Sequence, residues 1–182
     1  AKSDIILDLV KVMGCGMDLK TKGKAISEFD INNLRFGKVI ICTDADVDGY
    51  QIRTLVLAMI YRLMPELIEA GKVYIAVSPL YEIIVGGKSY FAYNEKEKAD
   101  ILKKFEGKKV SVQRSKGLGE NEPEMMSLTT MHPDTRRLQK IMPSDVKETA
   151  EVFDVLLGND LQGRKEIIAN CGREYIDLAD IS

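Results

Sequence analysis

A short run of β-branched residues that leads directly into three aspartates constrains the fold of this chain more than any other feature. The run begins at Val39 and predicts a strand over residues 39–43, and Asp44, Asp46 and Asp48 follow at alternate positions. An apolar run of this kind is typical of a strand buried in a parallel sheet. A second such run occupies residues 73–77. The order predicts a β-α-β unit with parallel strands, and therefore an α/β fold.

The segments around the acidic turn are predicted from their apolar patterns. Residues 49–70 carry a wide apolar arc and predict a helix that is buried against a sheet. Pro65 is expected to kink or restart this helix, because proline removes a backbone donor. Before the acidic turn, residues 4–12 predict an amphipathic helix, and the polar stretch 18–30 predicts a loop.

From residue 81 onward the pattern changes to that of an α+β tail. Two apolar runs separated by Gly86-Gly87 predict a β-hairpin, because paired glycines favour tight turns. The remaining elements are a helix over 95–105, a strand over 109–114, a helix from Pro123 to about Met131, an irregular passage, and helices over 144–157 and about 162–171.

The three aspartates predict a cation site, since unneutralised carboxylates so close together repel one another. The pattern D-x-D-x-D-G also opens calcium-binding EF-hand loops, which need a bidentate Glu at the twelfth position. Leu55 stands there, and a strand rather than a helix precedes the acids, so that alternative fails. Asp44 and Asp46 share one face of an extended segment and suit Mg²⁺, which prefers hard oxygen ligands. Asp48, beside the helix start, is predicted to be a helix cap that adds negative potential.

The composition limits the possible partners and compartments. The chain has 182 residues, 45% of them hydrophobic, and a net charge of −2. A self-sufficient nucleic-acid binder is usually basic, so tight DNA binding by this chain alone is not expected. No apolar run approaches the roughly 18 residues that would span a bilayer. The three cysteines are widely spaced and predict free cytosolic thiols.

Several motifs, in order along the chain, resemble one family closely. T-D-A-D-V-D-G, I-R-T, M-P-E-L, V-Y-I-A and P-L-Y resemble the TOPRIM region of the B subunit of bacterial DNA gyrase and its topoisomerase IV counterpart. Q-R-S-K-G-L-G-E, N-E-P-E, T-T-M and R-R-L, between residues 113 and 138, resemble the downstream part of the same subunit. The resemblance does not distinguish gyrase from topoisomerase IV.

The resemblance implies part of an ATP-dependent type IIA topoisomerase, which cuts one DNA duplex, passes another through and reseals the break. It implies that Asp44 and Asp46 are the catalytic, Mg²⁺-binding pair and that Asp48 is a more peripheral metal ligand. The nucleophilic tyrosine of the family lies on the A subunit. The implied setting is therefore an A2B2 heterotetramer on duplex DNA, without a membrane, in the bacterial cytoplasm at the nucleoid.

Departures from the family pattern define what this sequence is expected to lack. The family's catalytic Glu, in an E-G-D-S-A motif on the first TOPRIM strand, has no counterpart here, and neither does the ATPase domain that binds ATP. The sequence is thus expected to be a fragment with an incomplete, Rossmann-like TOPRIM part over residues 1–80 and a gyrase-B-type tail over 81–182. Alone, it is expected to be inactive.

Further candidates have two interpretations each. Lys116-Gly117-Leu118-Gly119 can cradle a phosphate through backbone N–H groups or be an ordinary loop. In the family this loop lies near the cleavage site, which makes Arg114 and Lys116 candidates for DNA contact. Arg53 is expected to contact a phosphate or to orient a carboxylate. His132, the sole histidine, fits an exposed loop better than an acid/base role.

Two alternatives to the enzymatic function stay open at this stage. One is a non-catalytic docking module that joins the A subunit and shapes the DNA gate. The other is a different TOPRIM protein, such as a primase or a type IA topoisomerase, although the K-G-L-G-E and T-T-M motifs favour type II.

Overall fold

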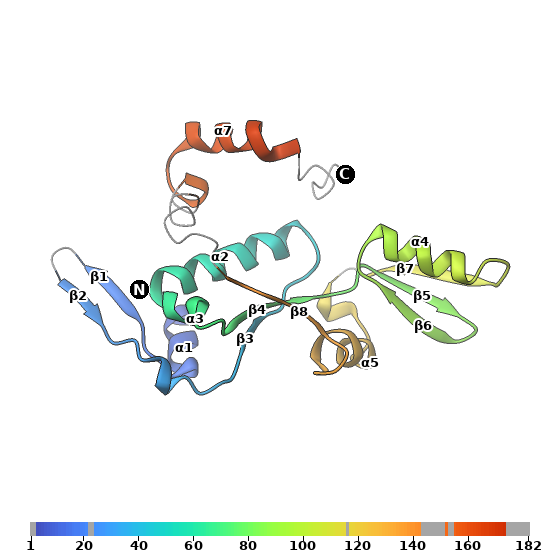
Figure 1. The fold of residues 1–182 in the computed structure, drawn as a ribbon, viewed down its shortest axis with the longest axis horizontal. Coiled ribbons are helices and arrows are strands. Elements are labelled where there is room, and N and C mark those ends of the chain that lie inside the picture. Colours follow the sequence, from blue (N-terminus) through green and yellow to red (C-terminus); the bar gives the residue numbers. More distant parts are fainter. Residues whose placement is uncertain (1–2, 22–23, 116, 143–151, 153–154, 174–182) are drawn as a thin grey trace. The chain divides into compact units, whose positions relative to one another are not determined.

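The computed structural model describes residues 3–21, 24–115, 117–142, 152 and 155–173. Residues 1–141 form one compact unit and residues 142–182 a second. Figure 1 shows the order of the elements along the chain. Among the described residues, no helix has both the length and the apolar character needed to cross a membrane.

The β-α-β unit predicted from the sequence is confirmed. β3 (Val39–Ile41) and β4 (Val73–Val77) pair in parallel, with Val39 opposite Val73 and Ile41 opposite Ile75. The connection contains α2 (Val47–Leu63) and α3 (Pro65–Glu69). Pro65 stands at the first turn of α3, where its missing N–H has no helical partner to lose.

A hydrophobic core holds these elements together with α1 (Asp4–Met13). Met64, Leu67 and Val73 are completely buried in this core, and Val10 and Met13 of α1 join them. α1 ends at Gly14, which adopts a positive φ of 80°. The core fixes the carboxyl ends of β3 and β4, the edge where ligands bind in α/β sheets.

Two predictions in this unit were wrong, and both concern polar strands. Residues 18–30, predicted as a loop, contain the antiparallel hairpin of β1 (Asp18–Thr21) and β2 (Lys24–Ser27), followed by the short 3₁₀ helix η1 (Ile31–Asn33). The passage after Met131 contains β8 (Arg137–Lys140), which pairs antiparallel with β4. Backbone hydrogen bonds form these ladders, and edge strands tolerate charged side chains, so the apolar pattern does not reveal them.

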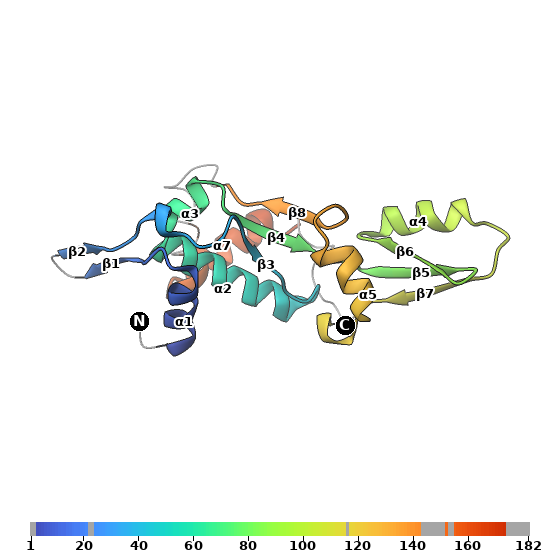
Figure 2. The same ribbon diagram turned by 90° about the horizontal axis from the view of Figure 1, so that it is seen from below.

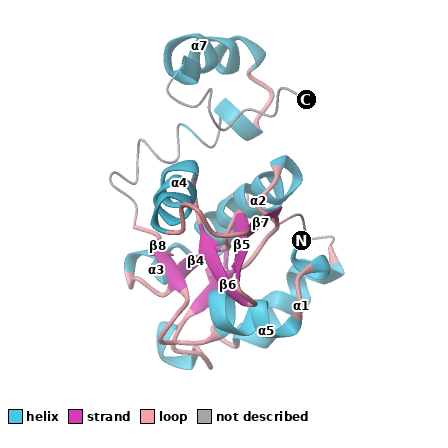
Figure 3. Ribbon diagram, turned by 90° about the vertical axis from the view of Figure 1, so that its right-hand side faces the viewer, coloured by secondary structure: helices cyan, strands magenta, loops and turns pink. Residues whose placement is uncertain are grey.

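The predicted hairpin of the tail is confirmed and has a third strand. β5 (Tyr81–Val85) pairs with β6 (Lys88–Ala92) and with β7 (Val110–Arg114), both antiparallel. Gly86 and Gly87 have positive φ angles, as the tight turn requires. α4 (Glu95–Lys104) covers one face of this sheet (Figures 2 and 3).

The remaining described elements are short. η2 (Leu118–Glu120) is a 3₁₀ turn, and α5 (Pro123–Met126) runs into the π-helical segment η3 (Ser127–Met131). In the second unit, residues 155–157 are helical and α7 (Leu161–Cys171) matches the predicted last helix. Most of the helix predicted over 144–157 lies outside the described residues.

Candidate metal centre

The acidic turn connects β3 to α2 and uses Asp46 as the cap of the helix. The Asp46 Oδ1 atom accepts a hydrogen bond from the Gly49 N–H at 2.7 Å. This arrangement satisfies one of the free N–H groups in the first helical turn. Asp48, which the sequence predicted to be the cap, is instead an exposed residue of the first turn. That prediction was wrong because α2 begins at Val47 and not after Asp48.

Asp44 is held by a partner far away in the sequence. Its Oδ1 atom accepts a hydrogen bond from the backbone N–H of Leu118 at 2.7 Å, and both residues are half-buried. Leu118 belongs to the K-G-L-G loop, for which a phosphate cradle and an ordinary loop are the two interpretations of the sequence. The structure therefore brings this loop to Asp44, and the Leu118 N–H of the loop donates a hydrogen bond to the Asp44 carboxylate.

Glycines allow the backbone to close around Asp44. A Cβ atom added to Gly49 would lie 2.0 Å from the Asp44 main-chain oxygen, and the two atoms would overlap at this distance. A Cβ atom added to Gly117 would lie 3.3 Å from the Asp44 Oδ2 atom. The contact at Gly49 depends on the absence of a side chain, and the one at Gly117 would be tight with a side chain, so both glycines have a packing role at this site.

The carboxylates of the turn are the type of ligand that a hard divalent cation prefers. A carboxylate has about four lone-pair sites, so Asp44 and Asp46 each keep acceptor capacity beyond the single hydrogen bond described. Within the described ranges, no group of three or more His, Cys, Asp or Glu side chains is arranged to hold a metal. A pair of carboxylates with water completing the shell is the arrangement that Mg²⁺ usually takes. The start of α2 adds positive potential beside these charges.

The basic residues considered for DNA contact or catalysis lie on different elements. Arg53, on α2, lies with its guanidinium 4.8 Å from the centre of the Tyr50 ring. In the described part of the chain no aspartate forms an ion pair with it, which does not favour a carboxylate-orienting role. Arg114 is exposed at the end of β7, and Lys116 lies outside the described residues. His132 is exposed in a turn after η3, as the sequence predicted.

Arg114 lines a small polar pocket beside the K-G-L-G loop. The pocket has a volume of about 250 Å³ and lies between the ends of β5 and β7 and the segment that leads into α5. Its other lining residues are Glu82, Gln113, Ser115, Asn121, Glu122 and Met125. The Ser115 hydroxyl donates to the Asn121 side-chain oxygen at 3.0 Å, which ties the two ends of the loop together.

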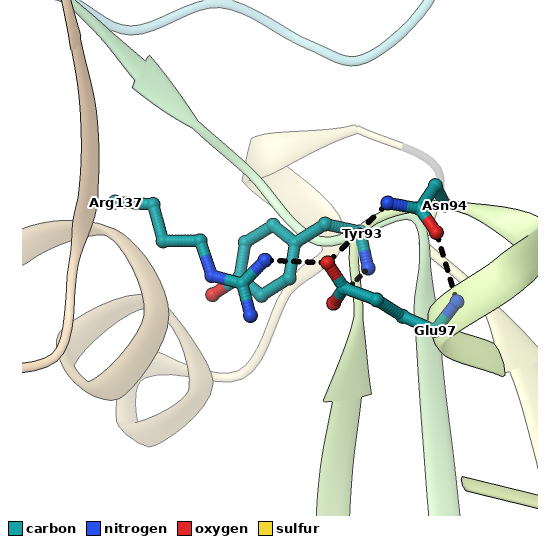
Figure 4. A network of polar contacts seen from close by, with 4 residues as sticks. All are labelled: Tyr93, Asn94, Glu97 and Arg137. Atoms are coloured by element: carbon teal, nitrogen blue, oxygen red, sulfur yellow. Dashed lines mark hydrogen bonds and ion pairs between the residues drawn. The ribbon is translucent and has the colours of Figure 1, made fainter. Parts of the chain in front are cut away.

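A network that the sequence did not predict joins β8 to the start of α4 (Figure 4). Arg137 Nη1 donates to Glu97 Oε1 at 2.7 Å, and the guanidinium lies 3.7 Å from the centre of the Tyr93 ring. Glu97 also accepts a hydrogen bond from the Tyr93 N–H, and the Asn94 side chain caps the helix by accepting from the Glu97 N–H. The Arg137 guanidinium holds the pKa of Glu97 below its usual value. The only sequence signal was R-R-L, which gives no partner.

Comparisons with known proteins address the same two parts of the chain. The family model for the Toprim domain matches residues 3–77, and the model for the carboxyl terminus of the DNA gyrase B subunit matches residues 107–169. The chain belongs to the DNA gyrase B family. The first match contains the acidic turn, and the second contains the loop that reaches Asp44.

Named members of the gyrase B family match nearly the whole chain. The DNA gyrase B subunit of Thermotoga maritima is 42% identical over 92% of this chain, and that of Thermus thermophilus is 44% identical over 93%. The Archaeoglobus fulgidus protein of the same name is 42% identical over 97%. The chain spans about a quarter of the length of these curated relatives, since the matches cover 25%, 26% and 26% of them. The resemblance to the DNA gyrase B subunit is confirmed at the level of the family.

Proposed function

We propose that this chain holds Mg²⁺ for cleavage and religation of duplex DNA in a type IIA topoisomerase. The observation that carries the proposal is the acidic turn at the carboxyl end of β3, with Asp44 and Asp46 as the metal-binding pair and Asp48 nearby. Membership of the gyrase B family supports it, because the Toprim match includes all three aspartates. When bound, the cation stabilises negative charge on the scissile phosphate and on the leaving 3′ oxygen.

Each candidate residue of the site has a defined part in this proposal. Asp44 and Asp46 bind the cation, and the Leu118 N–H and the Gly49 N–H fix the orientation of their carboxylates. Asp48 adds negative potential at the helix start. Arg53, Arg114 and Lys116 contact backbone phosphates of the DNA, since guanidinium and ammonium groups are the usual phosphate donors.

The proposed setting extends beyond the chain itself. The nucleophilic tyrosine lies on a partner A-type subunit, the complex is an A2B2 heterotetramer in the cytoplasm, and ATP binds to a different domain of the gyrase-B-type protein. We further propose that residues 1–80 belong to the TOPRIM domain and residues 81–182 to the gyrase-B-type tail. The two family matches, at 3–77 and 107–169, support this division.

Cleavage assays in a full-length gyrase-B-type protein that carries this region, combined with an A-type subunit, test the proposal. Asp44→Ala and Asp46→Ala should each lower the Mg²⁺-dependent cleavage rate by about two orders of magnitude or more. A lost metal ligand removes several kcal/mol of charge stabilisation, and about 1.4 kcal/mol corresponds to a factor of ten. Asp48→Asn should have a milder effect.

ATP hydrolysis is the control, because it should persist in all three variants and so separates lost chemistry from misfolding. If the Asp44 and Asp46 variants cleave DNA at rates near that of the unmodified enzyme, the two residues do not bind the catalytic metal. That result would favour the alternative of a docking module. In the isolated chain, calorimetry should show weak Mg²⁺ binding, and micromolar affinity that survives Asp44→Ala would contradict the assignment.

A further inference from the structure

The loop that follows β7 is held at Ser115 and reaches Asp44 at Leu118. Ser115 donates its N–H to the Leu80 carbonyl at 2.9 Å, which fixes the loop at the end of β7. Three residues later, the Leu118 N–H donates to Asp44 Oδ1 at 2.7 Å. This hydrogen bond joins residues 74 positions apart. A charged acceptor makes it one of the stronger classes of hydrogen bond.

The two glycines of the loop differ in their relation to Asp44. A Cβ atom on Gly117 would lie 3.3 Å from Asp44 Oδ2, a tighter approach than most Cβ atoms make, and 3.7 Å from its Cγ, an ordinary contact. A Cβ atom on Gly119 would have no atom within 4 Å. Neither glycine has a positive φ angle. Of the two glycines, therefore, only Gly117 is at a position where an added methyl group would press on the carboxylate.

We infer that the K-G-L-G loop positions Asp44 for the cation, and that cation binding at Asp44 and the conformation of this loop are coupled. The inference rests on the proposed function, because it takes Asp44 to be a metal ligand. The Leu118 N–H holds one carboxylate oxygen, so the cation meets a side chain whose rotation is already restricted. A cation that favours this orientation of Asp44 also favours the loop conformation that supplies it.

The coupling acts in both directions, as linkage between two equilibria requires. A cation at Asp44 stabilises the loop, and a correctly placed loop raises the affinity for the cation. Arg114 directly precedes this loop at the end of β7, so under the proposed function its presentation to DNA depends on whether the cation is bound. Leu118 and Gly117 are thus positioning residues for Asp44.

Mn²⁺ binding to the whole 182-residue chain, followed by electron paramagnetic resonance, tests the inference with a matched pair of variants. Gly117→Ala should weaken Mn²⁺ binding about fivefold or more, the lower end of typical coupling between sites. Gly119→Ala adds the same methyl group to the same loop without a contact and should leave the affinity unchanged. Asp44→Ala should weaken binding more than Gly117→Ala does.

Hydrogen exchange of the Leu118 amide, measured by nuclear magnetic resonance, gives a readout that does not depend on the fold of the glycine variants. In the unmodified chain, Mg²⁺ should slow this exchange. In Asp44→Ala the amide should exchange faster and should no longer respond to Mg²⁺. Exchange that Mg²⁺ leaves unchanged or accelerates in the unmodified chain would overturn the inference.

The results distinguish a failure of the inference from a failure of the proposed function. If the unmodified chain binds no Mn²⁺, or if Asp44→Ala keeps full affinity, the metal assignment itself is wrong and the inference fails with it. If Asp44→Ala loses affinity while Gly117→Ala binds as tightly as Gly119→Ala, the metal assignment stands and the positioning role of the loop is overturned.

Discussion

At the scale of single residues, the three aspartates of the turn have different structural roles although their sequence spacing is regular. Asp44 accepts from Leu118, Asp46 caps α2, and Asp48 is exposed in the first turn. The sequence predicted where the acidic site lies, because a strand followed by acids is a local pattern. It could not predict the Leu118 contact, since that depends on tertiary folding.

Asp46→Ala should destabilise the chain by about 1 kcal/mol, because the free N–H of Gly49 loses its acceptor. Asp46→Asn should keep the stability within a few tenths of a kcal/mol, since asparagine caps helices about as well as aspartate. Urea denaturation of the two variants measures both effects. Equal destabilisation by alanine and asparagine would show that Asp46 contributes charge and not a cap.

Gly49→Ala tests the close approach to Asp44. Helix propensity alone favours alanine over glycine by about 1 kcal/mol. The added Cβ would lie 2.0 Å from the Asp44 carbonyl oxygen, however, and overpacking of this kind costs about 1–3 kcal/mol. We therefore expect net destabilisation in urea denaturation. Gly37→Ala, whose Cβ would meet nothing within 4 Å, is the control, and a stabilised Gly49→Ala variant would contradict the geometry.

At the scale of elements, whether the sequence predicted a strand depends on what stabilises that strand. β3 and β4 contribute buried side chains to a core, so their apolar runs identified them. β1, β2 and β8 are short and rich in polar residues, and backbone pairing defines them. The sequence pattern therefore found the parallel β-α-β unit and the tail hairpin, and missed the polar strands added to the sheets.

The network at the start of α4 makes a prediction about β8. Arg137→Ala should destabilise the chain by about 1–2 kcal/mol, the sum of a partly exposed ion pair and a cation–π contact. Arg137→Lys should recover only part of this, because lysine lacks the planar guanidinium that stacks on Tyr93. Lys11→Ala, which removes a solvent-exposed pair with Asp8, should change stability by less than about 0.5 kcal/mol.

The ion-pair part of this effect should depend on pH. The pKa of Glu97 is lowered in the folded chain, chiefly by the hydrogen bond from Arg137, below its ordinary value of 4.5. The contribution is therefore complete above about pH 4.5 and is lost as the pH falls through the folded value. The difference in unfolding free energy between the unmodified chain and Arg137→Ala should therefore shrink as the pH falls below about 4.5. A difference that stays constant down to about pH 3 would mean that stacking on Tyr93 accounts for all of it.

At the scale of the whole molecule, the balance of charge limits what the chain can do by itself. It carries 26 Lys and Arg residues against 28 Asp and Glu residues, for a net charge of −2. Phosphate neutralisation supplies nearly all of non-specific DNA affinity. Under the proposed function, a chain with no net positive charge and an acidic turn at its proposed active site shares this neutralisation with the cation and with an A-type subunit.

The isolated chain should therefore bind duplex DNA poorly. Fluorescence anisotropy with a labelled duplex at about 150 mM salt should give no saturation below about 10 µM chain, within the weak range of non-specific binding. Once an A-type subunit and Mg²⁺ are added in the full-length context, Arg114→Ala should reduce the salt dependence of binding by about one phosphate contact. Lys88→Ala, an exposed residue at the far end of the hairpin, should leave it unchanged. Submicromolar binding by the chain alone at this salt concentration would mean that its basic residues form a DNA-binding surface without help from a partner.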